Sequence, residues 1–404
     1  GMNMRHGVLH GIAICLTILA LALIAGCGSG SGGATSTDGG EDMAAAATMT
    51  GAPAELLPNA DELWSGKVPV DAGAGSLEGI YLRQTPDASG KFDANIYLVS
   101  SSNQVVALNR NGMPKWVFKR MELPPEFPPV EGPGAVAFIT RNKLWVVHRE
   151  TGSLLLSRSL PFTPSAPPAL SASAVYIPSL ADNRIYSLSI ADGGLGWRIR
   201  LSSPITAAPT IAGSVGRPSL HVATQKGGVF AFDALSATAP PPSEPRWQKK
   251  LPDGVVADLT TSIDRTLVYV PCEDFALHAF RASTGEEAWS YNAGRPLKVS
   301  ALEVGEIVFV KSEGKVIALN AADGAVKWTL EGIQRPICQW GKDYLLRNTD
   351  GKVLRVMADS GEVLAAETLP DGMPTEFVVT DPMGGRCITA DRDWNLSVLV
   401  RRKY

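Results

Sequence analysis

The sequence predicts an all-β fold, an eight-bladed β-propeller, from three observations. First, residues 266–294 and 307–332 form a tandem repeat of alternating apolar strands, tight turns and an outer strand that carries a tryptophan. Second, the two tryptophans, Trp289 and Trp328, are 39 residues apart, which is about the length of one four-stranded blade. Third, this period continues along most of the chain. Because a repeat of this size cannot bury its apolar faces alone, its copies must pack against one another.

The N-terminal residues predict export and lipidation. Residues 12–25 form an apolar run that would rise about 21 Å as a helix, against a bilayer core of about 30 Å. The run is therefore typical of a signal peptide and not of a transmembrane anchor. It ends in Ile24-Ala25-Gly26-Cys27, which resembles a bacterial lipobox, and an ordinary signal peptide with a chance cysteine is the alternative. We expect residues 1–26 to be a lipoprotein signal peptide and Cys27 to carry the lipid.

The next segment, residues 27–60, is predicted to be a flexible tether. It is rich in Gly, Ser, Thr and Ala and has no hydrophobic period, so it cannot bury enough apolar surface to become ordered. Gly28 follows the lipidated position. By resemblance to known lipoproteins of Gram-negative bacteria, the lack of Asp there favours the outer over the inner membrane. We expect a propeller at residues 61–404 on the periplasmic side of the cell envelope.

From residue 61 onwards, each repeat can be followed through its outer strand. The outer strands contain, in order, Trp116, Leu155 and Leu156, Trp197, Trp247, Trp289, Trp328, and Val363 and Leu364. The steps between them are about 40, 41, 50, 42, 39 and 36 residues, and the long step contains a Pro-rich insertion at 239–245. Two strands with period-2 patterning precede each outer strand, as at residues 307–311 and 316–320. Strands of this kind between Gly, Asn and Asp turns predict an all-β repeat fold.

The two ends of the repeat region predict how the ring closes. Residues 377–380, 387–390 and 396–401 supply three strands of a last blade, and the chain then has no room for an outer strand. Residues 63–68 form an outer strand with its tryptophan, Trp64, but have no blade before them. Joining these three strands to the N-terminal outer strand gives one composite blade, which closes the ring without an open sheet edge. Seven continuous blades and one composite blade make eight; a seven-bladed ring is the alternative.

The turn-and-tryptophan frame resembles the quinoprotein-type (PQQ-like) propeller repeat. The matching segments are KVIALNAADGAVKW at 315–328, ALHAFRASTGEEAW at 276–289 and, more weakly, VVALNRNGMPKW at 105–116. Within that repeat type, a lipoprotein with this tether and blade number is similar to the BamB family. The resemblance implies a scaffold in the complex that inserts β-barrels into the outer membrane. The insertion at 239–245 and the loop at 121–134 depart from that family.

Charge and cysteine content exclude some classes of function. The formal net charge is −3, and Lys and Arg are scattered, so no nucleic-acid partner is expected. Outside the N-terminal segment the cysteines are Cys272, Cys338 and Cys387, in strand-like runs. They lack CxxC or Cys/His spacing, so neither a zinc site nor another metal site is expected. We expect buried free thiols, with a Cys338–Cys387 disulfide as the alternative.

An enzyme of the quinone-dependent dehydrogenase class is the rival interpretation. By resemblance, such enzymes hold their cofactor with calcium, a stacking tryptophan and often an adjacent cysteine pair, which this sequence lacks. The strongest carboxylate groups are Glu273-Asp274 and Asp391-Arg392-Asp393. Oxygen ligands at this spacing suit Ca²⁺, but short polar turns also favour Asp. With no catalytic motif in the chain, we predict no catalytic residues and no cofactor. Binding of a quinone cofactor or another ligand is the alternative function.

The predicted function is protein binding by one face of the propeller. In this fold, the turns between the two middle strands and the blade-to-blade connectors emerge on the same face. The first connector, at 121–134, is rich in proline and carries Leu123 and Phe127 as candidate anchors. The turns add Glu273, Asp274, Asp391 and Asp393, which predict an acidic face for a basic partner. The alternatives are a connector packed on its own propeller and partner binding at a sheet edge. We expect a monomer with an envelope partner, following the resemblance to the barrel-assembly scaffold.

Overall fold

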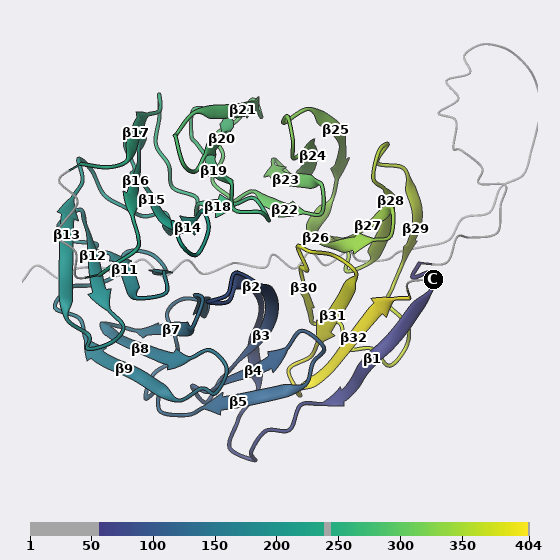
Figure 1. The fold of residues 1–404 in the computed structure, drawn as a ribbon. Helices are drawn as coiled ribbons and strands as arrows, with labels where there is room; N and C mark the ends of the chain where they lie inside the picture. The colour runs from purple at the N-terminus through teal and green to yellow at the C-terminus, as the bar shows by residue number, and fades with distance from the viewer. Residues whose placement is uncertain (1–55, 238–243, 403–404) are drawn as a thin grey trace, which may run out of the picture. The chain divides into compact units, whose positions relative to one another are not determined.

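The computed structural model describes residues 56–237 and 244–402 as eight four-stranded antiparallel sheets arranged in a ring (Figure 1). The predicted signal peptide, Cys27, residues 27–55 of the tether and most of the insertion at 239–245 lie outside the described residues. Within the described residues, no helix is both long and apolar enough to span a bilayer. The eight sheets confirm the predicted eight-bladed propeller, and the seven-bladed alternative is wrong.

In blades 1 to 7 the strands run in chain order from the centre of the ring to its rim. Blade 1 contains β2 (Leu77–Pro86), β3 (Phe92–Ser100), β4 (Val105–Asn109) and β5 (Pro114–Phe118). Blade 2 contains β6 (Val130–Glu131), β7 (Ala135–Thr140), β8 (Lys143–His148) and β9 (Leu154–Ser159). Blade 3 contains β10 (Ala169–Leu170), β11 (Ala174–Pro178), β12 (Arg184–Ser189) and β13 (Leu195–Arg200). Blade 4 contains β14 (Thr210–Ala212), β15 (Ser219–Ala223), β16 (Gly228–Asp233) and β17 (Trp247–Lys250).

The second half of the ring repeats this order. Blade 5 contains β18 (Thr260–Thr261), β19 (Leu267–Pro271), β20 (Ala276–Arg281) and β21 (Glu287–Asn292). Blade 6 contains β22 (Leu302–Val304), β23 (Ile307–Ser312), β24 (Lys315–Asn320) and β25 (Val326–Glu331). Blade 7 contains β26 (Ile333–Trp340), β27 (Asp343–Asn348), β28 (Val353–Met357) and β29 (Val363–Glu367). Blade 8 contains β30 (Phe377–Val379), β31 (Arg386–Ala390), β32 (Asn395–Arg401) and β1 (Ala60–Lys67).

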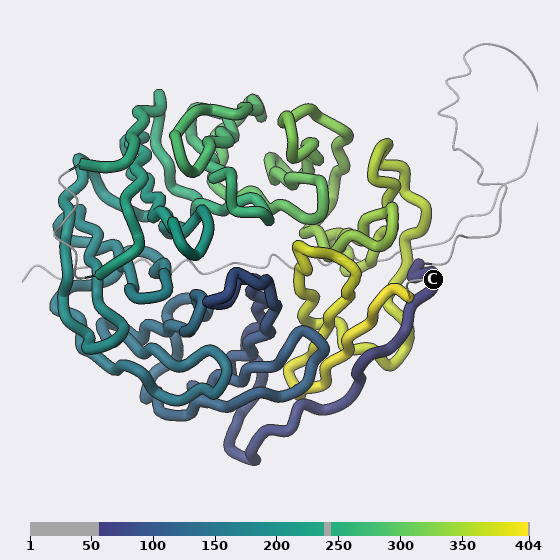
Figure 2. The backbone as a smooth tube through the Cα atoms, in the orientation of Figure 1, coloured from purple at the N-terminus to yellow at the C-terminus, as the bar shows by residue number. Residues whose placement is uncertain are grey.

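Blade 8 is the composite blade that the sequence predicts. Its outer strand β1 pairs with β32 from Ala60 opposite Arg401 to Lys67 opposite Asn395, and Figure 1 shows the two ends of the described ring side by side. Arg402 Nε donates a 2.7 Å hydrogen bond to the Asp61 carboxylate. Pairing the first strand of the propeller with the last leaves no gap in the ring of sheets (Figure 2).

The segment before β1 also packs on the ring. Leu56 and Leu57, which the sequence places at the end of the tether, are buried with Trp340 and Cys338 of blade 7. Trp340 Nε1 donates to the carbonyl oxygen of Pro58 at 3.0 Å. Two adjacent leucines carry enough apolar area to hold an otherwise polar segment in place, so the packed part of the chain begins at least as early as Leu56.

The outer-strand tryptophans join neighbouring blades. Trp289 Nε1 of blade 5 donates to the Ala321 carbonyl oxygen of blade 6 at 3.0 Å, and its ring lies against Gly324 in the next turn. A Cβ at Gly324 would lie 2.5 Å from the ring, so the turn needs glycine for contact as well as for its φ of 72°. The same pairing recurs at Trp116 with Gly152, Trp247 with Gly285, and Trp328 with Gly361. This contact is the physical reason why a Gly turn and a Trp recur together in the sequence.

The inner strands are the least regular part of the ring. Six blades, blades 2 to 6 and blade 8, begin with an inner strand of three residues or fewer, whereas β2 and β26 have 10 and 8 residues. The long β2–β3 hairpin lies toward the centre of the ring (Figure 2), and its turn at 87–91 is near the inner loops of blades 4 and 5. The three cysteines outside the N-terminal segment are free and buried, as expected, and no disulfide joins Cys338 to Cys387.

Candidate partner surface and central cavities

The strand order defines two faces of the ring. What we call the connector face carries the turns between the second and third strands of each blade and the blade-to-blade connectors, such as 119–129 and 272–275. The opposite face carries the remaining turns. All six residues predicted to bind a partner lie on the connector face or at its edge. They lie in three places, and the blade 5 turn is across the ring from the other two (Figure 1).

The Pro-rich connector between blades 1 and 2 is fastened to its own propeller. Asn103 Nδ2 donates to the Glu122 carbonyl oxygen at 3.0 Å, and the Glu126 amide donates to Ile139 at 2.8 Å. Phe127 is half-buried against the core of blade 2, whereas Leu123 keeps 38% of its surface exposed. Of the two predicted anchors, only Leu123 presents much of its side chain to solvent.

The blade 5 turn contains two carboxylates with different surroundings. Glu273 Oε1 is 3.4 Å from Lys298 Nζ, and its side chain is 27% exposed. Asp274 Oδ2 is 2.9 Å from His278 Nε2, and its side chain is only 10% exposed. Glu273 is therefore the accessible acid of the pair, and Asp274 faces into the blade.

The blade 8 turn lies beside blade 1. Asp391 accepts hydrogen bonds from the amides of Asp393 and Asn395 at 2.9 and 3.0 Å, so its carboxylate holds the turn. Asp393 is exposed, and Arg392 is within ion-pair distance of Glu78 and Glu376. The carboxylate of Asp391 shapes the turn, while that of Asp393 is offered to solvent.

Carboxylates outnumber cations on the connector face, in agreement with the predicted acidic character. The acidic residues in its turns and connectors are Asp71, Glu122, Glu126, Asp182, Asp253, Asp258, Glu273, Asp274, Glu313, Asp350, Asp371, Glu376, Asp391 and Asp393. The basic ones are Lys119, Arg120, Arg141, Lys226, Arg295, Lys298, Lys352 and Arg392. A surface with this imbalance attracts a basic partner, and salt weakens the attraction.

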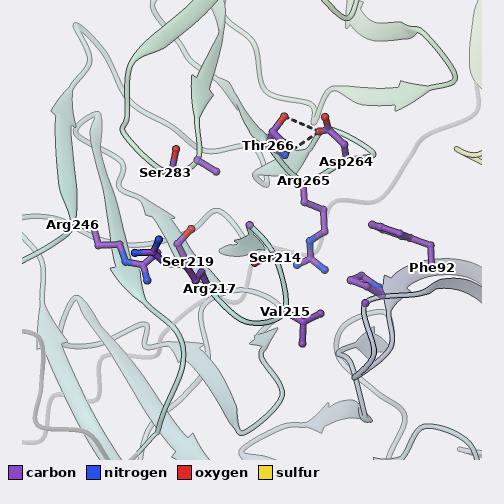
Figure 3. A pocket seen from close by; sticks show the side chains of 14 residues that line it. Phe92, Ser214, Val215, Arg217, Ser219, Arg246, Asp264, Arg265, Thr266 and Ser283 are labelled. Atoms are coloured by element: carbon purple, nitrogen blue, oxygen red, sulfur yellow. Dashed lines mark hydrogen bonds between the residues drawn. The ribbon is translucent and has the colours of Figure 1, made fainter.

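Two cavities lie along the centre of the ring. The first, of about 470 Å³, is lined by the inner strands, including Arg83 and Glu131 on one side and Asp258 and Glu303 on the other. The second, of about 580 Å³, opens on the opposite face between the β2–β3 turn and blades 4 and 5. Figure 3 shows Arg265 extending into this second cavity, with Phe92 across from it and Arg217 and Arg246 together on another side.

Two of the three arginines that line the second cavity have partners for their side chains. Arg265 Nη2 donates to the Ile211 carbonyl oxygen at 2.5 Å, and Arg246 Nη2 pairs with Asp233 at 2.8 Å. Burial lowers the pKa of Arg265 to about 10. No tryptophan or cysteine lines either cavity, and the outer-strand tryptophans are held between blades. The chemistry of these linings does not fit the stacked quinone site of the rival interpretation.

A buried ionic network between blades 1 and 2 is a feature that the sequence analysis missed. Glu131, on β6, accepts hydrogen bonds from Tyr97 and, at 2.8 Å, from Asn95 Nδ2. Its other oxygen is 3.3 Å from Arg149 Nη2, and both charged side chains are almost fully buried. Burial raises the pKa of Glu131, and Arg149 and the two hydrogen bonds oppose that rise.

A second copy of the Tyr–Glu contact joins Tyr269 of blade 5 to Glu303 of blade 6. Tyr97 and Tyr269 each lie opposite an alanine on the third strand of their blade, and Glu131 and Glu303 are each the second residue of the next inner strand. Superimposing the repeats in the sequence would have revealed this pairing, because both partners occupy equivalent repeat positions.

The fold and its blade contacts define the class of this protein as an eight-bladed β-propeller of the PQQ-like repeat type. In solved structures, BamB from Moraxella catarrhalis matches with a TM-score of 0.60 and 15% identity, over 84% of this chain and 99% of that chain. A computationally designed protein, Ika8, matches with a TM-score of 0.54 and 14% identity, over 76% of this chain and 93% of that chain. At these identities the likeness concerns the fold alone.

The sequence comparison identifies the family of this chain. Residues 142–250 and 235–381 match the family model described as "Outer membrane protein assembly factor BamB", and together these segments cover more than half of the chain. The chain therefore belongs to this PQQ-like BamB family, as its repeats indicated.

Three curated relatives carry the name outer membrane protein assembly factor BamB. The one from Yersinia pestis is 31% identical over 107 residues, 24% of this chain and 27% of its own length. Those from Nitrosomonas eutropha and Bordetella pertussis are 28% identical over 190 residues and 26% identical over 208 residues. These two matches cover 46% and 48% of this chain, and 42% and 49% of the relatives' lengths. The chain thus spans between about a quarter and a half of the curated relatives that it matches.

Proposed function

We propose that this protein is a non-catalytic scaffold in outer-membrane protein assembly. The observation that carries the proposal is the family match over residues 142–381, since that family and three relatives are named for this role. The architecture supports it. A ring whose outer-strand tryptophans and Glu131–Arg149 pair serve blade contacts leaves its turns and connectors as the surface for binding.

The proposed location is the periplasmic side of the outer membrane, with the lipid on Cys27 as the anchor. The support comes from the order of the apolar run, the small residues and Cys27 in the sequence. Globomycin, which blocks the lipoprotein signal peptidase, should cause the unprocessed precursor to accumulate. A Cys27→Ala variant should leave the membrane fraction. If globomycin does not block processing and Cys27→Ala stays in the membrane fraction, the proposed anchor is wrong.

We further propose that the connector face binds the partner, with Leu123, Phe127, Glu273, Asp274, Asp391 and Asp393 in or around the contact. Leu123, Glu273 and Asp393 are the members that offer exposed atoms to a partner. Phe127, Asp274 and Asp391 act by holding the shapes of the connector and the two turns. The acidic balance of the face favours a basic surface on the barrel-assembly complex.

A pull-down from detergent-solubilised envelope tests the function directly. The tagged wild-type protein should recover a component of the barrel-assembly complex, and recovery of none would contradict the proposal. The face is tested by the double variant Glu273→Lys and Asp393→Lys, which should reduce recovery several-fold at low salt. Glu286→Lys with Glu362→Lys is the matched control, because both residues are exposed on the opposite face. Equal loss in the two variants would exclude the connector face.

A further inference from the structure

Three side chains with metal-binding atoms converge at the connector-face end of blade 5. Cys272 follows β19, Asp274 lies in the turn, and His278 lies on β20. One ligand atom from each, a thiol sulfur, a carboxylate oxygen and a ring nitrogen, lie within 4.8 Å of one another. This is the one such group of three among the residues that the structure describes.

The hairpin brings these residues together although they are not adjacent in sequence. Val270 pairs with His278 across β19 and β20, and side chains two residues apart on a strand point to the same side of the sheet. Cys272, two residues after Val270, is therefore on the same side as His278. Phe275 has a φ of 77°, which turns the chain sharply and directs Asp274 back over the imidazole.

The surroundings of His278 match those of a metal-bound histidine. Its Nε2 is 2.9 Å from Asp274 Oδ2, and its Nδ1 is 2.8 Å from Glu287 Oε2. A neutral imidazole has a single N–H and cannot donate to both carboxylates. With a metal at Nε2, Asp274 becomes a ligand, and Nδ1–H still donates to Glu287. A histidine ligand that donates its other N–H to a carboxylate is a recurrent arrangement.

We propose that Cys272, Asp274 and His278 bind a zinc ion, with Glu287 as the outer carboxylate that orients His278. Thiolate, imidazole and carboxylate together suit Zn²⁺, whereas Ca²⁺ and Mg²⁺ prefer oxygen ligands alone. Tetrahedral zinc places its ligand atoms about 3.3–3.8 Å apart, so binding moves the Asp274 oxygen outward and the thiol inward by about 1 Å or less.

The site has a route to solvent and room for a fourth ligand. The side chains of Asp274 and His278 keep 10% and 11% of their surface exposed, and Glu287 keeps 43%. A water molecule entering beside Glu287 completes the tetrahedron. Binding replaces the proton on the Cys272 sulfur, so zinc uptake releases a proton to solvent. The ion would then join the two middle strands of blade 5 at their turn.

Cobalt is the probe that tests the proposal, because Co²⁺ in a tetrahedral site with a thiolate gives intense visible bands and a thiolate-to-metal charge-transfer band. The purified full chain is stripped with chelator and titrated with Co²⁺ and then Zn²⁺. We expect one equivalent of Co²⁺ with both kinds of band, which Zn²⁺ then displaces. A weak octahedral spectrum without charge transfer in the wild type overturns the proposal whatever the variants do.

Variants assign the ligands. Cys272→Ser should abolish the charge-transfer band, and Glu287→Gln should keep the spectrum while weakening affinity about 10–100-fold. Cys387→Ser is the matched control, because Cys387 is also a buried free thiol but lies in blade 8; it should change neither. A charge-transfer band that persists in Cys272→Ser, or that vanishes in Cys387→Ser, would show that these ligands are wrong.

Discussion

Glu131 and Arg149 are the most consequential charged residues in the described ring, because both are buried and each needs the other. Truncating Glu131 to alanine removes the nearer carboxylate of the buried Arg149 guanidinium, which keeps only Glu150 at 3.7 Å, and removes the acceptor of Tyr97 and Asn95. Breaking a buried ion pair in this way costs about 3–5 kcal/mol. We expect Glu131→Ala to lower the free energy of unfolding by about that amount in urea titrations.

The control for this prediction is a surface pair on the same propeller. Glu286 faces Arg281 at 3.6 Å with 73% of its side chain exposed, and pairs of this kind are worth less than about 1 kcal/mol. Glu286→Ala should therefore be nearly neutral. If Glu131→Ala were as mild as this control, the network would be replaceable and would not hold blades 1 and 2 together.

Asp381 should make stability depend on pH. Burial raises its pKa from 3.8 to about 6, although Arg386, Arg110 and a hydrogen bond from Gln84 oppose the rise. The folded protein therefore holds a proton that the unfolded chain has lost between about pH 4 and pH 6. Over this window the Asp381 contribution falls as pH rises, by up to about 3 kcal/mol at 1.36 kcal/mol per pKa unit.

Asp381→Asn removes that titration while keeping the shape of the side chain. The stability of the variant minus that of the wild type should rise between pH 4 and pH 6 and stay level above it. Asp359→Asn, at a side chain that is 89% exposed, is the control and should give only a small difference. A level difference for Asp381→Asn across the same range would contradict the buried, protonated carboxyl.

For single residues, the sequence predicted which residue types occur in the turns better than it predicted what each side chain does. Asp274 and Asp391 were expected as acids offered to a partner, yet one faces His278 and the other caps its own turn. Single-letter patterns show that a turn is acidic, but they do not show where each carboxylate points. The sequence did not predict the group of Cys272, Asp274 and His278 for the same reason. These side chains come together only when β19 pairs with β20.

At the scale of the strands and turns, the Gly–Trp contact explains how one blade is fitted to the next. Gly324 and Gly294 have the same φ of 72°, but an added Cβ would meet the Trp289 ring at 2.5 Å in the first case and nothing within 4 Å in the second. Gly294→Ala should cost about 1–2 kcal/mol from the left-handed backbone alone. Gly324→Ala should cost about 1–3 kcal/mol more, because the clash forces the two blades apart.

Urea unfolding of the two variants isolates that second cost, since the backbone penalty cancels between them. Trp289→Leu in the Gly324→Ala background should recover part of the loss by making room for the methyl group. Equal losses for the two glycine variants would mean that the blade contact adjusts freely.

The elements themselves were largely predictable, and the reason is the repeat. Seven of the outer strands and both middle strands of each blade follow from one pattern, so an error in one copy is corrected by the others. The inner strands break this rule: β6 has two residues and β2 has ten. They line the central cavity on one side, so no fixed apolar pattern marks their length.

At the scale of the whole molecule, ring closure depends on the short segment from Leu56 to Val68. This segment supplies β1, the Asp61–Arg402 contact and two leucines buried against blade 7. Burying the leucines alone is worth about 3–6 kcal/mol. A variant that starts at residue 56 should unfold at the same temperature as the full chain, whereas one that starts at residue 69 should be less stable by at least that amount.

Removing the segment also exposes the edge of β32, whose backbone groups would otherwise pair with β1. An unpaired edge of this length favours association with other chains, so the shorter variant should form oligomers on size exclusion. A synthetic peptide of residues 56–68 supplied separately should bind it and restore the monomer and its stability. The same peptide with Leu56→Ala and Leu57→Ala keeps the strand and loses the anchor, so it should bind more weakly. If the shorter variant stays monomeric and as stable as the full chain, the composite blade does not close the ring.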